Sequence, residues 1–158
     1  MPGGAHLSRT ALPLAILLLA ATAGCDSGVP VAVPSAAPSV IEACERLVYA
    51  LPDEVLGEGS RKVVPDSLIT AAWGDPPIEL ACGVAPPAEL ATAQSQCFEV
   101  NGVGWFAEPA ENGVVFTTIG RELYVEVAVP DDYAPEANAL IDLAAAVSQY
   151  NELVQPCT

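Results

Sequence analysis

The sequence predicts an α+β domain in which a small antiparallel sheet of about five strands is covered by N- and C-terminal helices. In the stretch Glu122–Val129, apolar side chains alternate strictly with other side chains, which is typical of a strand with one buried and one wet face. Two further stretches, near the two ends of the domain, repeat apolar residues at helical spacing. Helices of this kind bury their apolar stripes against such a sheet.

The N-terminus has the pattern of an export signal. A short polar head, Met1–Arg9, precedes the uninterrupted apolar run Ala11–Ala21. This run has 11 residues, whereas a membrane-spanning helix needs about 20. Residues 1–24 are therefore predicted to be a lipoprotein signal peptide.

The signal ends in Thr22-Ala23-Gly24-Cys25, which resembles a bacterial lipobox. In such a motif the cysteine is lipidated and becomes the first residue of the mature protein. The prediction is lipidation at Cys25 and an extracytoplasmic domain anchored to the outer face of the cell membrane. The alternative is an ordinary signal peptide that leaves Cys25 as a free thiol.

Residues 25–38 are predicted to be a lipid-anchored tether, because they are rich in Pro, Ala and Ser and have no sustained periodicity. A semi-extended tether of this length reaches up to roughly 40 Å, at about 3.1 Å per residue. This reach predicts that the domain, residues 39–158, stands clear of the membrane.

The first helix of the domain is predicted from Ser39 to Leu51. Ser39 and Glu42 fit the capping box S-x-x-E, and Pro52 would end the helix. Cys44 lies on its apolar stripe. The residues that follow, Pro52–Asp66, are acidic and contain glycine, which predicts a loop.

Short strands and turns are predicted to follow. Strands are expected at residues 67–73, 77–84, 97–100, 103–107 and 114–118, with a short helix within Pro86–Gln96. Asn101-Gly102 and Asn112-Gly113 are hairpin signals, and Ile119-Gly120 is predicted to be a tight turn leading into the alternating strand. A last helix is predicted from about Pro135 to Val154.

The cysteine count predicts two disulfides. The chain has five cysteines, and an odd number in an exported protein leaves one for another role, here Cys25. The remaining Cys44, Cys82, Cys97 and Cys157 allow three pairings. We favour Cys82–Cys97 as a local bridge and Cys44–Cys157 as a link between the ends of the domain.

Charge and composition exclude several functions. The formal net charge is −15, and all 20 acidic residues follow Cys25. A nucleic-acid partner is therefore excluded. The only histidine is His6, inside the predicted signal, so the domain has no Ser-His-Asp or Cys-His constellation. No cofactor and no metal site are predicted, and the domain is not expected to be an enzyme.

Two motifs resemble catalytic or cofactor sites but have simpler interpretations. Glu122 and Glu126 share the wet face of the alternating strand with Tyr124, and paired carboxylates serve in glycoside hydrolysis. In so acidic a chain, a solvated sheet face is the simpler interpretation. Gly102–Ala107 matches G-x-G-x-x-A, but it leads into strand sequence where a dinucleotide site needs a helix.

A few side chains are candidates for a ligand or partner surface. Trp73 and Trp105 would form an aromatic platform, although core packing is the commoner fate of tryptophan. Arg61 and Lys62 are the only adjacent cations of an acidic domain, and local ion pairs are the alternative. Arg121, next to a turn glycine, is the third cationic candidate, and the alternatives are an ion pair with a nearby acid or a bond to carbonyl groups.

The order of several motifs resembles a family of secreted actinobacterial lipoproteins, domain of unknown function 3515. The motifs are Cys25, AWGDPPIELACGV from Ala72 to Val84, VNGVGW ending at Trp105, and FTTIGRELYVEVAVP from Phe116 to Pro130. The resemblance implies an envelope lipoprotein with structural disulfides. It transfers no catalytic residue.

The sequence thus predicts a non-catalytic binding or scaffold module of the cell envelope, held at the membrane by the lipid on Cys25. Its expected partner is another envelope protein or a cell-wall component. Two alternatives are a protein that binds small ligands or cell-wall fragments, and an envelope hydrolase that depends on carboxylates.

Overall fold

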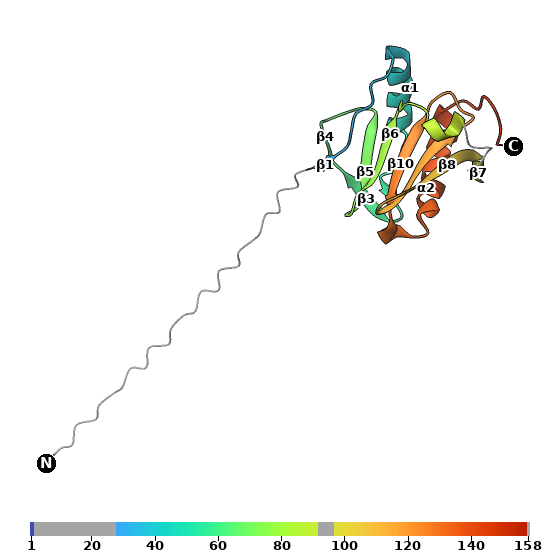
Figure 1. Ribbon diagram of the computed structural model, residues 1–158. Helices are drawn as coiled ribbons and strands as arrows, with labels where there is room; N and C mark the ends of the chain where they lie inside the picture. The colour runs from blue at the N-terminus through green and yellow to red at the C-terminus, as the bar shows by residue number, and fades with distance from the viewer. Residues whose placement is uncertain (2–27, 92–96, 158) are drawn as a thin grey trace.

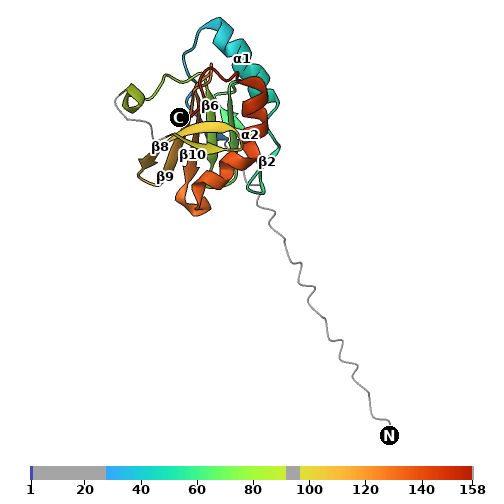
Figure 2. The same cartoon turned by 90° about the vertical axis from the view of Figure 1, so that its right-hand side faces the viewer.

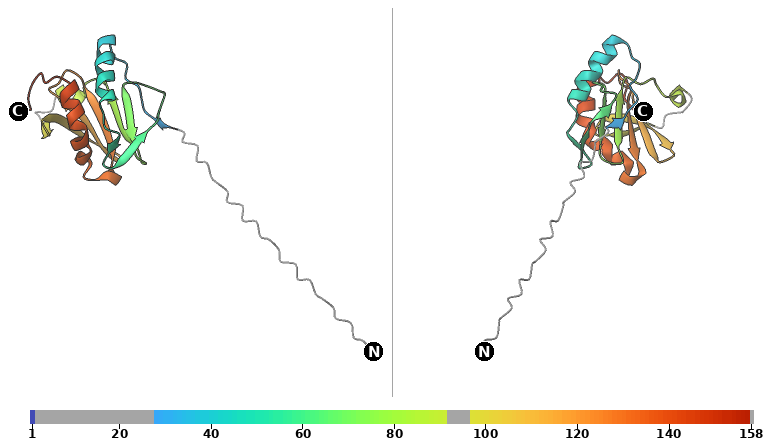
Figure 3. Two further views of the ribbon diagram at one scale, coloured as in Figure 1. Left: turned by 180° about the vertical axis from the view of Figure 1, so that it is seen from behind. Right: turned by 90° about the vertical axis from the view of Figure 1, so that its left-hand side faces the viewer.

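The computed structural model describes Met1, residues 28–91 and residues 97–157 (Figure 1). Two layers make up the described fold. One layer is a large antiparallel sheet, and the other consists of the helices α1 (Pro38–Tyr49) and α2 (Ala139–Tyr150), which lie side by side on one face of the sheet (Figures 1 and 3). The predicted α+β class, with helices from both ends covering one face, is confirmed.

Within the described residues the sheet has eight strands in the order β2-β3-β5-β6-β10-β9-β8-β7, so the prediction of about five strands is wrong. Every pairing in it is antiparallel. The strands are β2 (Glu54–Val55), β3 (Glu58–Arg61), β5 (Thr70–Trp73), β6 (Ile78–Cys82), β7 (Cys97–Val100), β8 (Val103–Ala110), β9 (Gly113–Ile119) and β10 (Val125–Pro130).

The missing strands come from the stretch Pro52–Asp66, which was predicted to be a loop. It contains β2, β3 and β4 (Val63–Val64). These strands are two to four residues long, and β2 and β3 form the edge of the sheet. Short edge strands are polar and carry little alternation, so the sequence pattern does not reveal them.

Part of the predicted tether belongs to the domain. Strand β1 (Val29–Pro30) pairs in parallel with β4. Val29 and Val31 are buried with Val63 and Ala72 in a second, small apolar cluster. The tether prediction is therefore wrong from Val29 onward, because alternate valines in a proline-rich segment bury their side chains against the sheet.

Both helices are shorter than predicted. Helix α1 begins at Pro38, no side chain caps its start, and it ends at Tyr49. The predicted capping box at Ser39 is therefore wrong. Pro38, in the first turn, has no N–H group that would need a capping partner. Helix α2 is preceded by the 3₁₀ turns η2 (Asp131–Tyr133) and η3 (Glu136–Asn138). The predicted short helix within Pro86–Gln96 appears as the 3₁₀ turn η1 (Ala88–Ala91); residues 92–96 lie outside the described residues.

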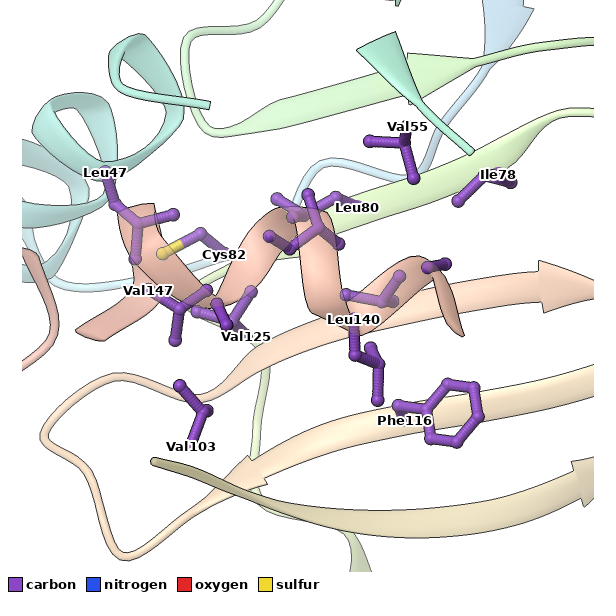
Figure 4. Packing of buried hydrophobic residues seen from close by; sticks show 14 of the residues in the cluster. Leu47, Val55, Ile78, Leu80, Cys82, Val103, Phe116, Val125, Leu140 and Val147 are labelled. Carbon is purple, nitrogen blue, oxygen red and sulfur yellow. The ribbon is translucent and has the colours of Figure 1, made fainter. Parts of the chain in front are cut away.

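The core lies between the helices and the inner face of the sheet (Figure 4). Leu47 of α1 and Leu140 and Val147 of α2 are fully buried. They face Leu80 of β6 and Val125 of β10 (Figure 4). The alternating side chains Leu123, Val125, Val127 and Val129 are all buried, so the predicted dry face is confirmed.

The hairpin signals have different outcomes. Asn101 and Gly102 have φ values of 48° and 79° and join β7 to β8 as predicted. Between β8 and β9 the two-residue turn is Glu111-Asn112, and Gly113 already pairs with Ala110. The predicted tight turn at Ile119-Gly120 is wrong, because β9 and β10 are joined by the longer segment Gly120–Tyr124.

The Gly120–Tyr124 segment is held by the chain that follows α2. Arg121 donates to the carbonyl oxygens of Asn151 and Gly102. The buried Asn151 side chain accepts from Leu123 N and donates to Leu123 O, both at 2.8 Å. These bonds end α2 earlier than predicted, because they require the chain to be extended at Asn151.

Both disulfides form, but with a different pairing from the favoured one. Cys44 of α1 bonds to Cys82 of β6, and Cys97 of β7 bonds to Cys157. The Cα atoms are 5.5 Å and 5.8 Å apart. The pairs Cys82–Cys97 and Cys44–Cys157 are therefore wrong. The sheet order separates β6 from β7 by three strands, which puts Cys82 out of reach of Cys97.

Candidate functional site

The outer face of the sheet, opposite the helices, contains the candidate site. Residues directly opposite each other on antiparallel strands project to the same side. Glu126 of β10 lies opposite Ala81 of β6 and Thr117 of β9. On the other side of β6, Thr70 of β5 lies opposite Ala81. The strand pairing thus lines up Thr70, Ala81, Glu126 and Thr117 in one row.

A second carboxylate lies diagonally from Glu126 in the neighbouring row. Glu79 of β6 pairs with Ala128 of β10, two residues along from Glu126. Burial raises the pKa of the Glu126 carboxyl above its usual value. Burial, followed by the negative charge of Glu126, also raises the pKa of Glu79. We call these two residues the acidic pair; both are half-buried on the central strands of the sheet (Figure 1).

Two threonine hydroxyls flank the acidic pair without a hydrogen-bond partner. Thr117 has no exposed surface and Thr70 has 3%, and neither Oγ1 atom is bonded. Buried hydroxyls normally have a partner, since an unpaired one costs free energy. Thr117 stands directly beside Glu126. Two buried hydroxyls without a partner therefore lie beneath the surface beside the two carboxyl groups.

A groove of about 500 Å³ adjoins the acidic pair. It lies where the outer face of β6, β9 and β10 meets the Glu111–Gly113 turn. Glu79 is one of its walls, and Val115, Ala128 and Pro130 provide apolar walls. The 3₁₀ turn η1, which follows β6, lies on this same side of the sheet (Figure 2).

We expect Glu126→Gln to change how stability depends on pH. A carboxyl whose pKa is raised by folding binds its proton more tightly in the native state, so the wild type gains stability as pH falls through the raised pKa. Above that pKa the buried carboxylate destabilises the fold. Glu126→Gln should therefore be more stable than the wild type at pH 7, and the difference should shrink toward pH 4, as measured by urea unfolding.

The matched control is Glu122→Gln, because Glu122 is exposed and lies outside β10. This variant measures the effect of replacing an exposed carboxyl with an amide. If Glu126→Gln and Glu122→Gln gave the same pH profile, the burial of Glu126 would have no energetic consequence.

The two tryptophans do not form an exposed aromatic platform. Trp73 is 1% exposed and Trp105 has no exposed surface. Trp73 Nε1 donates to the carbonyl oxygen of Pro52 at 3.0 Å, whereas Trp105 Nε1 has no partner. The aromatic platform is therefore wrong, and the alternative interpretation of core packing is confirmed, because both side chains project from the inner face into the core.

The three cationic candidates lie in different places. Arg121 is only 8% exposed and holds the C-terminal segment, so it is not a surface residue. Arg61 donates to Gly74 O at 2.8 Å and lines a smaller groove of about 240 Å³ beside Trp73. Lys62 is exposed, next to β4.

The predicted pair of Glu122 and Glu126 is not brought together on one strand. Glu122 lies in the segment that precedes β10, where its N–H donates to Glu152 O, and Tyr124 is half-buried in the same segment. Gly102–Ala107 runs from the turn into β8, which confirms its interpretation as part of a hairpin.

Sequence reasoning missed Glu79 as the partner of Glu126. The alternation of Ile78, Leu80 and Cys82 with Glu79 and Ala81 does place Glu79 on the wet face of its strand. Nothing in that pattern shows that β6 pairs with β10, however. The sequence therefore indicates that Glu79 lies on the wet face, but it does not indicate that Glu79 lies beside Glu126.

The described residues contain neither a candidate metal site nor a candidate membrane-spanning helix. In residues 28–91 and 97–157, no three His, Cys, Asp or Glu side chains are grouped so that they could hold a metal ion. Neither helix in that part of the chain is long and apolar enough to cross a membrane. Cys25 lies outside the described residues, so its lipidation stays a prediction.

Comparison with known proteins gives one match. A family model described as "Protein of unknown function (DUF3515)" matches residues 9–155. No curated protein and no solved structure matches the chain. The matched range includes every strand and both α-helices of the described residues.

Proposed function

The chain belongs to the DUF3515 family of proteins of unknown function, and we propose that it is an extracytoplasmic envelope lipoprotein whose domain is a non-catalytic binding module. The lipid on Cys25 anchors it to the outer face of the cell membrane. The outer face of the sheet, around the acidic pair, is its binding surface. Its partner is a cell-wall component or another envelope protein.

The pairing of the cysteines supports export and anchoring. All four domain cysteines are consumed in two disulfides, which persist in oxidising compartments outside the cytoplasm. Cys25 is the fifth cysteine, and none of these four is available to bond with it. It directly follows the small residues that end the apolar N-terminal run, which is the position of a lipidated cysteine.

The observation that carries the binding function is the state of the outer face. The helices pack on the inner face, whereas the outer face has two half-buried carboxyls and an adjoining groove. Polar groups that are partly desolvated but unpaired cost stability in the free protein. A ligand that pairs with the two carboxyl groups recovers that cost on binding.

The chemistry of the site favours a ligand with ammonium or amide hydrogens and a short apolar portion. Carboxylates accept hydrogen bonds from an ammonium group, and the apolar walls of the groove contact the rest of the ligand. Because an ammonium group favours the charged form of a carboxyl, its binding lowers the raised pKa values of the acidic pair. Binding near these pKa values therefore releases protons.

We expect an amine-bearing cell-wall fragment or short peptide to raise the melting temperature of the protein. A ligand at about 100 times its dissociation constant adds roughly 2.7 kcal/mol of stability. Glu126→Gln and Glu79→Gln should each abolish the shift, because they remove a charged acceptor. A thermal-shift screen of cell-wall fragments, sugars, peptides and divalent cations measures this, and calorimetry in two buffers measures the proton release.

The control is Glu122→Gln, which should keep the full shift. A saturable ligand that binds equally well to Glu126→Gln would place the binding surface elsewhere. If no compound in the screen shifted the melting temperature, the small-ligand form of the proposal would fail, and crosslinking in the membrane would then test for an envelope protein as partner.

A carboxylate-dependent hydrolase is the second candidate, because two neighbouring carboxyls with raised pKa values are the pair that acid–base catalysis uses. Turnover of a bound cell-wall fragment, lost in both Glu79→Gln and Glu126→Gln, would favour it over binding alone. Binding without turnover would exclude it for that fragment.

A further inference from the structure

We infer that the corner of the domain formed by β1 and β4 rests directly on the membrane surface. This inference rests on the lipid anchor at Cys25 proposed above and adds the orientation of the domain. It replaces the expectation of a long tether that holds the domain away from the bilayer.

The position of Val29 in the fold is fixed by bonds and burial. Val29 N donates to Lys62 O at 2.7 Å, and Val31 N donates to Val64 O at 3.1 Å. Both valine side chains are only 4% exposed. The chain is therefore part of the domain from Val29 onward.

The chain between the anchor and this fixed point is short. Only Asp26, Ser27 and Gly28 separate Cys25 from Val29. A fully extended chain spans at most about 3.6 Å per residue, so Val29 lies within about 14 Å of Cys25. A lipid on Cys25 lies in the bilayer, and the β1–β4 corner consequently cannot leave its surface.

The side chains of this corner suit contact with lipid headgroups. Val33 and Val64 are each 44% exposed, and Leu68, in the connection from β4 to β5, is 69% exposed. Lys62, next to β4, is an exposed cation in a domain with few cations. Asp66 is an exposed acid of the same connection, so the corner combines apolar surface with balanced charge.

The strand order carries the acidic remainder of the domain away from the membrane. Strand β5, which contacts β4, lies toward one edge of the sheet, and β7 forms the opposite edge. The five spacings from β5 to β7 amount to roughly 24 Å at about 4.8 Å per strand. This distance exceeds the Debye length of about 8 Å. The negative surface potential therefore acts weakly on the far strands β8 and β7.

The test uses the full-length chain, produced in a bacterium that processes lipoproteins and placed in nanodiscs of phosphatidylcholine and phosphatidylglycerol. A lipid with a gadolinium chelate on its headgroup weakens the NMR signals of nearby amides. We expect a several-fold greater loss at Val33, Lys62 and Val64 than at Asn101 and Gly102, which form the β7–β8 turn. Equal losses at all these amides, or the largest loss at the turn, would overturn the inference.

A variant with an insertion separates orientation from anchoring. About twelve Gly/Ser residues between Ser27 and Gly28 add a mean reach of roughly 20 Å, and we expect them to reduce the loss at Val64 while the protein stays in the nanodisc. If the signal loss at Val64 stayed the same, the short chain between Cys25 and Val29 would not be what keeps the corner at the membrane. If instead the wild type failed to enter nanodiscs, as Cys25→Ser should, the anchor itself would be refuted, which is a different failure.

Discussion

Replacing both Cys44 and Cys82 with alanine is expected to lower the free energy of unfolding by at least about 4 kcal/mol. The disulfide closes a loop of 38 residues, and on the chain-entropy model a loop of this length stabilises by about that amount. Small domains have a total stability of only about 5–15 kcal/mol. Urea unfolding followed by circular dichroism measures the loss.

The burial of this disulfide makes its removal more costly than loop entropy alone. Cys44 and Cys82 have no exposed surface, and the bond fastens α1 to β6 at the centre of the core. Alanine in place of each cysteine leaves a small cavity between helix and sheet, which adds to the cost. We therefore expect that α1 packs less stably on the sheet in this variant.

The matched variant replaces Cys97 and Cys157 with alanine. Its loop of 60 residues predicts a similar entropic loss of about 4 kcal/mol, but this bond lies at the edge strand β7. The Cys44/Cys82 variant should therefore be the less stable of the two. Peptide mapping without reduction must yield Cys44–Cys82 and Cys97–Cys157, and a Cys82–Cys97 peptide would refute this pairing.

Asn151→Ala is expected to destabilise the fold by about 2–3 kcal/mol. The Asn151 side chain is 1% exposed and forms two hydrogen bonds with the backbone of Leu123. Its removal leaves the buried N–H of Leu123 without an acceptor, which costs about 1–3 kcal/mol. Leu123 O keeps the bond from Thr118 Oγ1, so the cost of the second lost bond is small. Urea unfolding measures the total.

Hydrogen exchange shows whether this loss has the expected cause. The amide of Leu123 should exchange faster in Asn151→Ala than in the wild type, since its acceptor is missing. Asn138→Ala is the control, because Asn138 is exposed and its side chain caps no helix. A variant Asn151→Ala with unchanged stability and unchanged exchange at Leu123 would contradict the role given to this side chain.

Local patterns in the sequence were sufficient for the two-layer architecture. Alternation in Glu122–Val129 identified the buried face of β10, and helical spacing identified α1 and α2 as its cover. Asn101-Gly102 identified a hairpin, because a turn that needs positive φ selects these residues. Each of these features depends on residues within a few positions of one another, so they can be predicted from one chain.

The binding surface and the disulfides could not be predicted in this way. Glu79 and Glu126 meet only because β6 pairs with β10, which lies 40 or more residues away along the chain. The same pairing separates β6 from β7 and thereby decides which cysteines can bond. Strand partners that are distant in sequence are chosen by the packing of the whole domain.

The sequence alone determined the class of fold, the buried face of its central strand, the four cysteines that form disulfides and the family. The tertiary structure decided the order of the strands, the cysteine partners, the acidic pair and the early start of the domain at Val29. The physical reason is the distance along the chain between the residues that interact. Local conformation and the choice of buried face follow from neighbouring residues, whereas a site assembled from several strands exists only after those strands have packed together.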